Sequence, residues 1–307
     1  MKIFVNRQPV TGPWGGGNKT LSSLCEKLVS LGHVLTFDLQ DDCEIIFCFD
    51  PRRSNNGYDY EHFLRHKRKF GTKIIHRVGD VGSHSKPELT RLLRATLPNA
   101  DRVIFTSLWA KEYLQYHKKN GTVIENGALT QFYKHRKKTS TKDQKIKIVT
   151  HHWSDNEKKG FDVYSTLGQL VHKEILDCIE FTYIGRYSSN FSSTGINVIE
   201  PKDKLELSKI LPAYDIYLTA SVEEAGANHV LEAMACGLPI LYRETGGSIV
   251  DYCSSFGVPY SDNVASLLNG ITKIINRYDF YLDNVKQYTR TTEDVVDEYM
   301  EIINEFD

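Results

Sequence analysis

From position 223 the chain runs Glu223-Glu-Ala-Gly-Ala-Asn-His-Val-Leu-Glu-Ala-Met-Ala-Cys-Gly-Leu-Pro239, and an apolar run at 216–220 precedes it. The apolar run predicts a strand, and the residues after the acidic pair predict a helix that begins near Asn228. Gly237 and Pro239 indicate the end of that helix, because glycine adopts the left-handed cap conformation and proline cannot continue a helix. The stretch therefore predicts one strand–loop–helix unit with acidic residues in its loop.

Two carboxylates of this stretch flank the start of the expected helix. Glu224 lies before the helix and Glu232 lies one turn inside it. The first-turn amides at 228–230 can bind an anionic phosphate end-on, so the two acids could bind hydroxyl groups on either side of it. That geometry suits a nucleotide-sugar, with one acid for the sugar and one for the ribose. Spacing alone, however, favours a solvent-facing loop and helix surface.

The rest of the chain alternates apolar β-rich runs with helical patterns. Strands are expected at 2–6, 34–37, 44–49, 73–78, 102–106, 122–125, 145–150, 180–184, 197–199, 216–220, 239–242 and 257–259. Helices are expected at 19–31, 60–70, 87–96, 108–117, 162–172, 204–211, 229–236 and 264–277, and in the tail at 279–306. This alternation predicts an α/β fold of parallel sheets covered by helices on both faces.

A polar segment divides the pattern into two units of similar size. Residues 134–145 contain no apolar side chain and are typical of an exposed linker. The expected domains are 1–140 and 141–285, followed by a C-terminal helix at 286–307 that packs back on the first domain. Because ligands of open α/β sheets bind at the carboxyl ends of the strands, we expect two Rossmann-like domains facing a cleft.

Composition excludes several classes of protein. Hydrophobic residues make up 40% and charged residues 25% of the 307 residues, which is typical of a globular protein and not of a disordered or fibrous one. No apolar run approaches the roughly 18 residues of a membrane span, and the first residues lack the apolar core of a signal peptide. The six cysteines include no Cys-x-x-Cys pair, which argues against a zinc knuckle and predicts reduced thiols in the cytoplasm.

The net charge of −1 hides opposite charges in the two halves. Residues 1–140 hold 23 Lys and Arg against 13 Asp and Glu, whereas residues 141–307 hold 15 against 26. The basic runs are Arg65-His-Lys-Arg-Lys69 and Lys134-His-Arg-Lys-Lys138. Such runs are usually solvated surface, but they could also attract an anionic glycan, a lipid-linked or phosphorylated acceptor, or a membrane surface contacted peripherally. Nucleic acid is a less favoured partner.

A glycine-rich loop, Gly12-Pro-Trp-Gly-Gly-Gly-Asn-Lys-Thr20, precedes the first expected helix. A dinucleotide fingerprint would need glycine where Thr20 stands, and the loop lies too far from the first strand. A P-loop is also disfavoured, because Asn18 is inserted between the last glycine and Lys19 and would turn the lysine by about 100°. The favoured interpretation is a loop whose bare amides, at Gly16 and Gly17, approach a diphosphate or a sugar.

Several motifs together resemble the GT-B glycosyltransferases, in particular the retaining family 4 type. Glu224-x7-Glu232, followed by Ala-Met-Ala-Cys-Gly-Leu-Pro and then Thr245-Gly-Gly247, is similar to that family's donor-site signature. Lys159-Gly160 resembles the Lys-Gly pair after the first donor-domain strand. Ala100-Asp-Arg-Val-Ile-Phe-Thr-Ser107 and Asn126-Gly127 resemble the end of the acceptor domain, and the glycine loop stands where the family has one, so the resemblance covers both halves.

The resemblance implies an enzyme that transfers a sugar from a nucleotide-diphosphate sugar with retention at the anomeric carbon. No metal or cofactor is expected, because Lys159 and the helix start at 228–230 could hold the leaving diphosphate and no Asp-x-Asp motif is present. The resemblance assigns the transferred sugar to Glu224, the ribose to Glu232 and the diphosphate to Lys159. It also places the donor against the helix start, where the contributing residues are Gly226, Ala227, Asn228 and His229.

Two positions depart from the family pattern. The family usually has an arginine five residues before the lysine, and here that position is Ser154, so phosphate neutralisation is either weaker or supplied by Arg186 after the next strand. The aromatic-Gly pair after the first acid is replaced by Gly226-Ala227. If Gly226 is aligned with the family glycine, the first acid becomes Glu223, but Glu224 keeps the seven-residue spacing and is preferred.

Histidine-containing segments give weaker signals. The loop His76-Arg-Val-Gly-Asp-Val-Gly-Ser-His84 corresponds to one in which family members often have a functional histidine. It offers Arg77, Asp80 and His84 as acceptor-side candidates, with Asp80 also a catalytic candidate; the alternative is that Asp80 caps the helix near position 87.

Two histidine pairs are candidate ligand sites. His62 and His66 lack a third metal ligand nearby, so a solvated basic face is favoured. His151-His152 lacks metal-ligand spacing; it ends a strand, where donor contact and a structural role are equally plausible.

Two other functions stay open at this point. A sugar-nucleotide epimerase of the same fold would need an acid and a base but no acceptor. A non-catalytic nucleotide-sugar binding protein would not need Glu224, Glu232 and Lys159 intact, and their presence argues against it.

Overall fold

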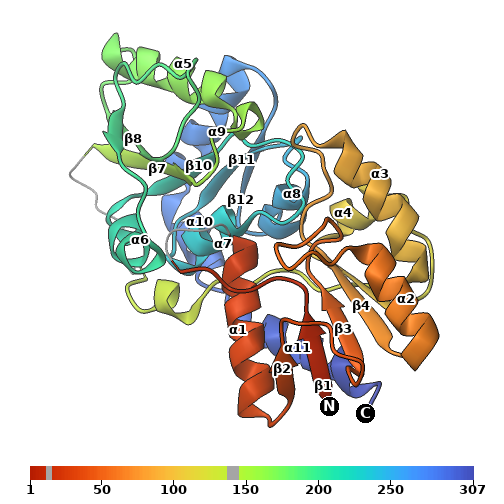
Figure 1. Ribbon diagram of the computed structural model, residues 1–307. Coiled ribbons are helices and arrows are strands. Elements are labelled where there is room, and N and C mark those ends of the chain that lie inside the picture. The colour runs from red at the N-terminus through yellow and green to blue at the C-terminus, as the bar shows by residue number, and fades with distance from the viewer. Residues whose placement is uncertain (12–15, 137–144) are drawn as a thin grey trace. The chain divides into compact units, whose positions relative to one another are not determined.

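The computed structural model describes residues 1–11, 16–136 and 145–307 (Figure 1). The chain forms two compact units, one built from Met1–Gly127 together with Thr292–Asp307, and the other from Ala128–Thr291. The chain thus enters the second unit at residue 128, and its C-terminal segment returns to the first unit. The expected linker at 134–145 falls largely outside the described residues, and its described part at 134–136 belongs to the second unit.

The first unit contains a six-stranded parallel sheet. Its strands are β1 (Lys2–Val5), β2 (Val34–Thr36), β3 (Ile45–Cys48), β4 (Lys73–Val78), β5 (Arg102–Phe105) and β6 (Gly121–Val123). The order across the sheet is β2-β1-β3-β4-β5-β6, so the direction in which strands are added reverses between β1 and β3. In open α/β sheets such a reversal opens a ligand site at the carboxyl ends of the two strands.

Helices cover both faces of this sheet. They are α1 (Gly16–Ser30), α2 (Tyr60–Phe70), α3 (Pro87–Thr96), α4 (Leu108–Tyr113) and α11 (Thr292–Asn304). Ile3 and Val5 of β1 pack with Val296 of α11, next to α1. Phe4 points to the opposite face, where its ring contacts Phe63 of α2. Successive residues of a strand are therefore buried on both sides, which explains its unbroken apolar run.

The second unit contains the other six-stranded parallel sheet. Its strands are β7 (Ile146–His152), β8 (Ile179–Gly185), β9 (Asn197–Ile199), β10 (Ile216–Thr219), β11 (Ile240–Arg243) and β12 (Gly257–Tyr260). The order is β12-β11-β10-β7-β8-β9, which is the Rossmann order, and the reversal lies between β7 and β10. Loops after these two strands are the expected place for a ligand.

Helices again cover both faces of the second sheet. They are α5 (Phe161–His172), α6 (Lys204–Ile210), α7 (Asn228–Ala235), α8 (Ser248–Cys253), α9 (Val264–Asn276) and α10 (Tyr278–Val285). Tyr217 packs with Val230 of α7 in one core, whereas its neighbour Leu218 packs with Tyr164 of α5 in another. Short 3-10 turns complete the unit at Thr130–Tyr133, Glu157–Lys159 and Leu211–Ala213, and a similar turn at Leu97–Asn99 follows α3 in the first unit.

The expected α/β class with two Rossmann-like units is confirmed, and a strand forms at every expected position. The helical pattern expected for the tail at 279–306 is divided between α10 and α11, and the helix expected at 286–307 begins only at Thr292. Residues 286–291 separate α10 from α11, because Thr291 forms a β-bridge with Ala128 and the Thr292 hydroxyl donates to the Gly127 carbonyl. Helix α8 was not expected, since six residues are too few for a clear helical period.

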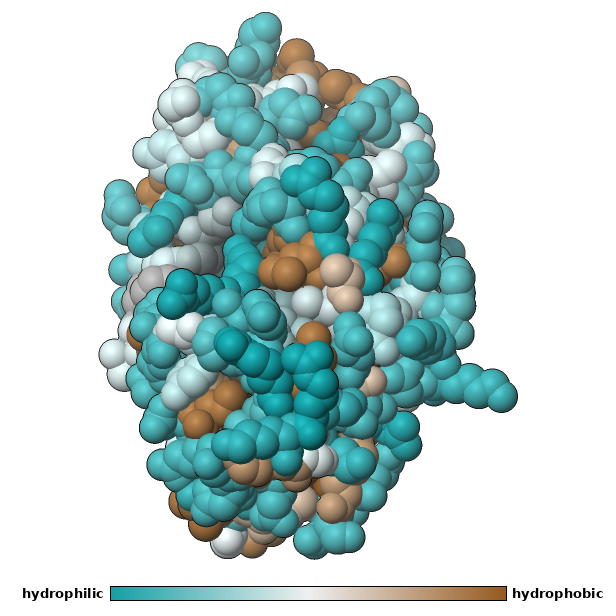
Figure 2. All heavy atoms as spheres, turned by 45° about the vertical axis from the view of Figure 1, so that its right-hand side comes forward, coloured by the Kyte–Doolittle hydropathy of each residue, from teal (hydrophilic) through white to brown (hydrophobic). Residues whose placement is uncertain are grey.

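The surface is mixed in character. Figure 2 shows one face, on which hydrophilic side chains predominate and hydrophobic ones form small separate groups. None of the helices in the described part of the chain combines the length and the apolar composition needed to cross a bilayer.

Candidate active site

In the second unit, the loops after β7 and β10 meet at the reversal point of the sheet. The Val222 amide donates to the Lys158 carbonyl at 2.9 Å, which ties one loop to the other. Gly160 has a φ of +82°, and a Cβ there would lie 2.4 Å from the Ala220 carbonyl oxygen. Only glycine permits both this conformation and this approach. The Lys159-Gly160 pair therefore has a physical basis: the glycine lets the lysine lie beside the β10 loop.

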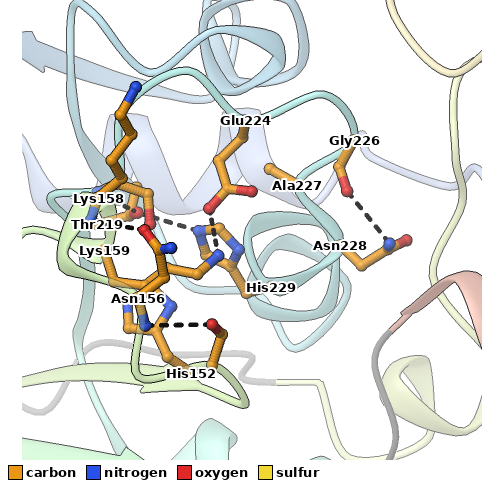
Figure 3. Close-up of polar contacts among 12 residues, drawn as sticks. His152, Asn156, Lys158, Lys159, Thr219, Glu224, Gly226, Ala227, Asn228 and His229 are labelled. Carbon is orange, nitrogen blue, oxygen red and sulfur yellow. Dashed lines mark hydrogen bonds and ion pairs between the residues drawn. The ribbon is translucent and has the colours of Figure 1, made fainter. Parts of the chain in front are cut away.

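Lys159 and Glu224 form a largely buried ion pair at this point (Figure 3). The lysine Nζ donates to the Glu224 carboxylate at 2.5 Å, and the two side chains are only 12% and 11% exposed. The backbone of Glu224 is held by the 245–248 loop, since its amide donates to Gly246 and its carbonyl accepts from Ser248. Gly247, at φ +70°, makes this approach possible, because a Cβ there would lie 2.6 Å from the Glu224 carbonyl oxygen.

The neighbouring acid is held differently. Glu223 has a positive φ of +53°, and its carboxylate pairs with Lys158 instead of Lys159. The Glu223 side chain is 43% exposed against 11% for Glu224. The structure thus separates the two acids into a solvent-facing pair and a buried pair, and Glu224 is the one in the buried pair.

Glu232 lies one turn inside α7 and contacts a histidine. Its carboxylate lies 2.9 Å from His151 Nε2, and both side chains are buried. Because a carboxylate only accepts hydrogen bonds, Nε2 carries the proton of this contact. His151 Nδ1 lies 3.1 Å from the hydroxyl of Tyr217, which holds the ring from its other side. His151 therefore positions Glu232, a role that sequence spacing alone did not assign to it.

The other histidines of this region contact hydroxyl groups of neighbouring residues. His152 contacts the Tyr164 hydroxyl at 2.8 Å. His229, the second residue of α7, contacts the Thr219 hydroxyl at 3.0 Å (Figure 3). Burial lowers the pKa of His229 to about 3, and the nearby Glu224 charge offsets only part of that shift. Its imidazole is therefore neutral at physiological pH and leaves Lys159 as the cation beside Glu224.

The start of α7 provides backbone donors. Ala227 is the N-cap and gives no side-chain cap, while its own amide donates to the Ser248 hydroxyl at 3.1 Å. The Asn228 side-chain amide donates to the Gly226 carbonyl, which fixes the turn into the helix (Figure 3). A helix start of this kind attracts anions through its first-turn amides and its dipole.

Arg186, the expected substitute for the missing arginine, follows β8. Its amide donates to the His152 carbonyl, and its exposed guanidinium stacks on the ring of Trp153, 3.9 Å from the ring centroid. Ser154, at the family's arginine position, accepts a hydrogen bond from the Asn156 amide. The structure thus brings Arg186 to the loop after β7, beside the position it would have to replace.

The acceptor-side candidates lie in the first unit. Asp80 accepts from the Gly82 amide at 2.9 Å and pairs with Lys86 at 2.8 Å, so it closes the loop before α3. It does not cap α3 directly, since the N-cap residue is Lys86. Arg77 is buried at the end of β4. Asp80 and Arg77 both line a pocket of about 310 Å³, whereas His84 is not among the residues that line it.

The glycine-rich loop is partly outside the described residues, which begin again at Gly16. Gly16 starts α1, and Gly17 lines the same pocket as Arg77 and Asp80. Asn18, which breaks the P-loop pattern, donates to the Val10 carbonyl and accepts from the Val10 amide. It therefore clamps the chain that follows β1 against the start of α1. Asp50 and Arg7 also line the pocket, and neither is among the site residues expected from the sequence.

The expected solvated face at His62 and His66 is only half right. His62 belongs to the capping box of α2 with Asp59, but His66 is buried and contacts Thr72 and the Gln40 carbonyl. Across the described ranges, no group of three or more His, Cys, Asp and Glu side chains is placed to hold a metal ion.

Residues 146–277, within the second unit, match the family described as glycosyl transferases group 1. No curated protein matches the chain by sequence.

Solved structures resemble the chain over nearly its whole length. Sucrose-phosphate synthase from Thermosynechococcus elongatus has a TM-score of 0.70 at 15% identity and covers 99% of this chain and 98% of its own. WaaG, a glycosyltransferase involved in lipopolysaccharide biosynthesis, has a TM-score of 0.70 at 12% identity, with 99% of both chains covered. Anabaena HepE in complex with UDP-glucose has a TM-score of 0.65 at 12% identity, also with 99% of both covered. At these identities the likeness establishes a shared fold. The chain thus shares the GT-B fold of these proteins, and residues 146–277 of its second unit match the glycosyl transferases group 1 family.

Proposed function

We propose that this enzyme transfers a sugar from a nucleotide-diphosphate sugar with retention at the anomeric carbon and without a metal ion. The observation that carries the proposal is the buried Lys159–Glu224 pair at the reversal point of the second sheet, beside the uncapped start of α7. The structural neighbour HepE has been solved with UDP-glucose, which supports a nucleotide-sugar as the class of donor.

Each member of the pair can share its charge with a donor. The ammonium group of Lys159 has three hydrogens and the carboxylate of Glu224 has several lone pairs, so both can keep their contact and bind a ligand. In the proposal Lys159 and the amides at 228–230 bind the diphosphate, and Glu224 binds hydroxyls of the transferred sugar. Glu232, positioned by His151, binds the ribose. Gly226 and Ala227 shape the turn, and Arg186 adds positive charge after β8.

Catalysis then depends on positioning and on charge stabilisation. Departure of the diphosphate leaves negative charge near Lys159 and the helix start, and positive charge develops on the sugar near Glu224. We place the reaction in the cytoplasm, since all six cysteines are free thiols. Asp80 stays a candidate for the acceptor side, where it lines the pocket of the first unit.

The direct test is incubation with a panel of UDP-, GDP- and ADP-sugars, with nucleotide release and sugar identity measured together. A glycosyltransferase slowly releases nucleotide by hydrolysis without acceptor. An isomerised sugar nucleotide without release indicates an epimerase, and binding without turnover indicates a non-catalytic protein; either result overturns the proposal. Loss of activity with EDTA and its recovery with Mg²⁺ would refute the metal-free part.

A further inference from the structure

The first sheet has its own reversal point, and a pocket lies there. The residues that follow β1 and β3 line it, together with the end of β4 and the start of α1; those used below are Arg7, Asp50, Arg77, Gly79 and Asp80. Its volume of about 310 Å³ suits a ligand of monosaccharide size. The position is the one that α/β sheets use for ligands.

The two acids of the pocket are neutralised by cations from its rim. Asp50 pairs with Arg52 through both carboxylate oxygens, at 2.6 and 3.0 Å, and lies 3.5 Å from Arg7. Burial opposes ionisation of Asp50, but the hydrogen bonds from Arg52 outweigh it, so its pKa lies below the usual value. Asp80 pairs with Lys86. Neither acid is thus left to balance a further positive charge.

Arg77 is the cation that remains. It is 3% exposed, and its hydrogen bonds go to neutral groups: Nε donates to the Tyr299 hydroxyl at 2.9 Å and Nη2 to the Asn126 side-chain oxygen at 3.1 Å. Its guanidinium also lies 5.2 Å from the ring centroid of Phe49. No ion pair found among the described residues includes Arg77. Because a guanidinium stays protonated in proteins, this is a buried charge without a counter-charge, which is costly.

The Nη1 edge of the Arg77 guanidinium lies beside Gly79 in the pocket wall. Gly79 lines the pocket, and a Cβ on it would lie 2.2 Å from Arg77 Nη1. The missing side chain at position 79 is therefore what gives Nη1 its place there. Hydrogen bonds to Tyr299 and Asn126 fix the other two nitrogens, so the group is held ready for a ligand with paired oxygens.

We propose that this pocket binds the acceptor and that Arg77 binds an anionic oxygen group on it, a phosphate or a carboxylate of a small saccharide. The assignment rests on the proposed glycosyl transfer, because only a transferase needs a second substrate. The anion supplies the counter-charge that no described residue provides. A donor diphosphate is the other possible source of such oxygens, and the experiment separates the two.

Calorimetry on the full chain measures the binding of five ligands: glucose 6-phosphate, glucuronate, inorganic phosphate, glucose and UDP. Wild type is expected to bind at least one of the anions about tenfold or more tightly than glucose. Arg77→Met should lose that preference and keep its UDP affinity. Arg65→Met, a change of an exposed arginine on α2, should alter neither. Lys159→Ala should weaken UDP binding and leave the anionic ligands unaffected.

A second variant keeps the inference testable if Arg77→Met does not fold. Gly79→Ala keeps the charge but forces Nη1 to move, and it should weaken the anionic ligands several-fold. Equal affinity for charged and neutral ligands in wild type overturns the inference, as does a folded Arg77→Met that binds the anions normally. Loss of UDP binding in Arg77→Met would assign the arginine to the donor. If wild type binds no nucleotide but keeps the anion preference, the donor proposal fails separately.

Discussion

The two units place charge at the same topological position in opposite ways. At the reversal point of the second sheet, the buried cation Lys159 is paired with the buried acid Glu224. At the reversal point of the first sheet, cations on the rim neutralise the acids, and among the described residues the buried cation Arg77 hydrogen-bonds to neutral groups and to no acid. A paired site suits a ligand that brings both anionic oxygens and hydroxyls, whereas an unpaired cation favours a ligand that brings net negative charge.

The largest effect is expected when the acid of the Lys159–Glu224 pair is replaced. Glu224→Gln removes the charge but keeps the shape, so the fold should persist while turnover falls about a hundredfold or more. Steady-state nucleotide release is the measurement. Glu223→Gln is the matched control, since that acid faces solvent with Lys158, and its activity should stay near wild type. The reverse pattern would move the sugar contact to Glu223.

The next effect concerns the cation of the same pair. Lys159→Ala should weaken UDP binding by roughly 1.5–3 kcal/mol, or about 10- to 100-fold, through loss of a charged hydrogen bond. It also removes the ion pair of the buried Glu224 carboxylate with Lys159, which adds to the cost. Calorimetric titration with UDP measures the change, and Lys158→Ala serves as the control. Unchanged affinity in Lys159→Ala would remove the lysine from the diphosphate site.

The loop contact that creates the paired site can be tested by stability. Gly160→Ala and Gly32→Ala both put alanine at a φ near +80°, which costs about 1–2 kcal/mol. A Cβ at Gly32 meets open space, but one at Gly160 meets the Ala220 backbone at 2.4 Å. Urea unfolding should therefore show a further loss of about 1–3 kcal/mol for Gly160→Ala. Equal losses would mean that the β10 loop moves away at no cost.

The strands were predictable from the sequence because burial on both faces leaves a local signature. Ile45–Cys48 is buried at every position, so an unbroken apolar run marks it. Capping residues give α2 a local signature too, because Asp59 marks its start and Gly71 its end. The short α8 has no such signature.

The site was predictable only where the chemistry is local. Lys159-Gly160 and the spacing of Glu224 and Glu232 stand out as motifs in the sequence. His151 and Glu232, however, lie 81 positions apart, and no sequence pattern pairs them. The state of Arg77 was beyond sequence reasoning for a similar reason. No acid in the described ranges pairs with Arg77, because Asp50 and Asp80 are paired with other cations, and that pairing is a property of the folded sheet.

The two units also differ in the surroundings of a buried histidine, His229 in the second unit and His76 in the first, and this difference predicts a dependence of stability on pH. His229 has a hydroxyl partner, whereas the ring nitrogens of His76 in β4 have none in the described structure. Burial lowers the pKa of His76 to about 3, with the charge of Asp50 opposing the shift. The unfolded chain takes up a proton near pH 6.5 and the native chain does not, so stability falls as pH drops below that value.

In His76→Phe, the free energy of unfolding should fall between pH 7 and pH 5 by about 2 kcal/mol less than in wild type. Urea unfolding at both pH values measures this difference. His117→Phe, at an exposed position, should change little. An identical pH dependence in wild type and His76→Phe would show that the ring is protonated, or water-exposed, in the native state.

The smallest expected effect concerns the basic surface of the first unit, which we propose contacts an anionic membrane. On α2, Lys67 already pairs with Asp101 at 2.7 Å, whereas Arg65 and Arg68 are exposed. Arg68→Gln should weaken binding to phosphatidylserine vesicles by about 1 kcal/mol, or roughly fivefold, and Lys67→Gln should change it less. Co-sedimentation at 50 and 300 mM salt measures both, and wild-type binding should fall with salt through screening. Nucleotide release should be unaffected, since α2 contributes none of the donor-site residues. If wild type ignores anionic vesicles at low salt, the basic surface of α2 is a solvated surface that binds no membrane.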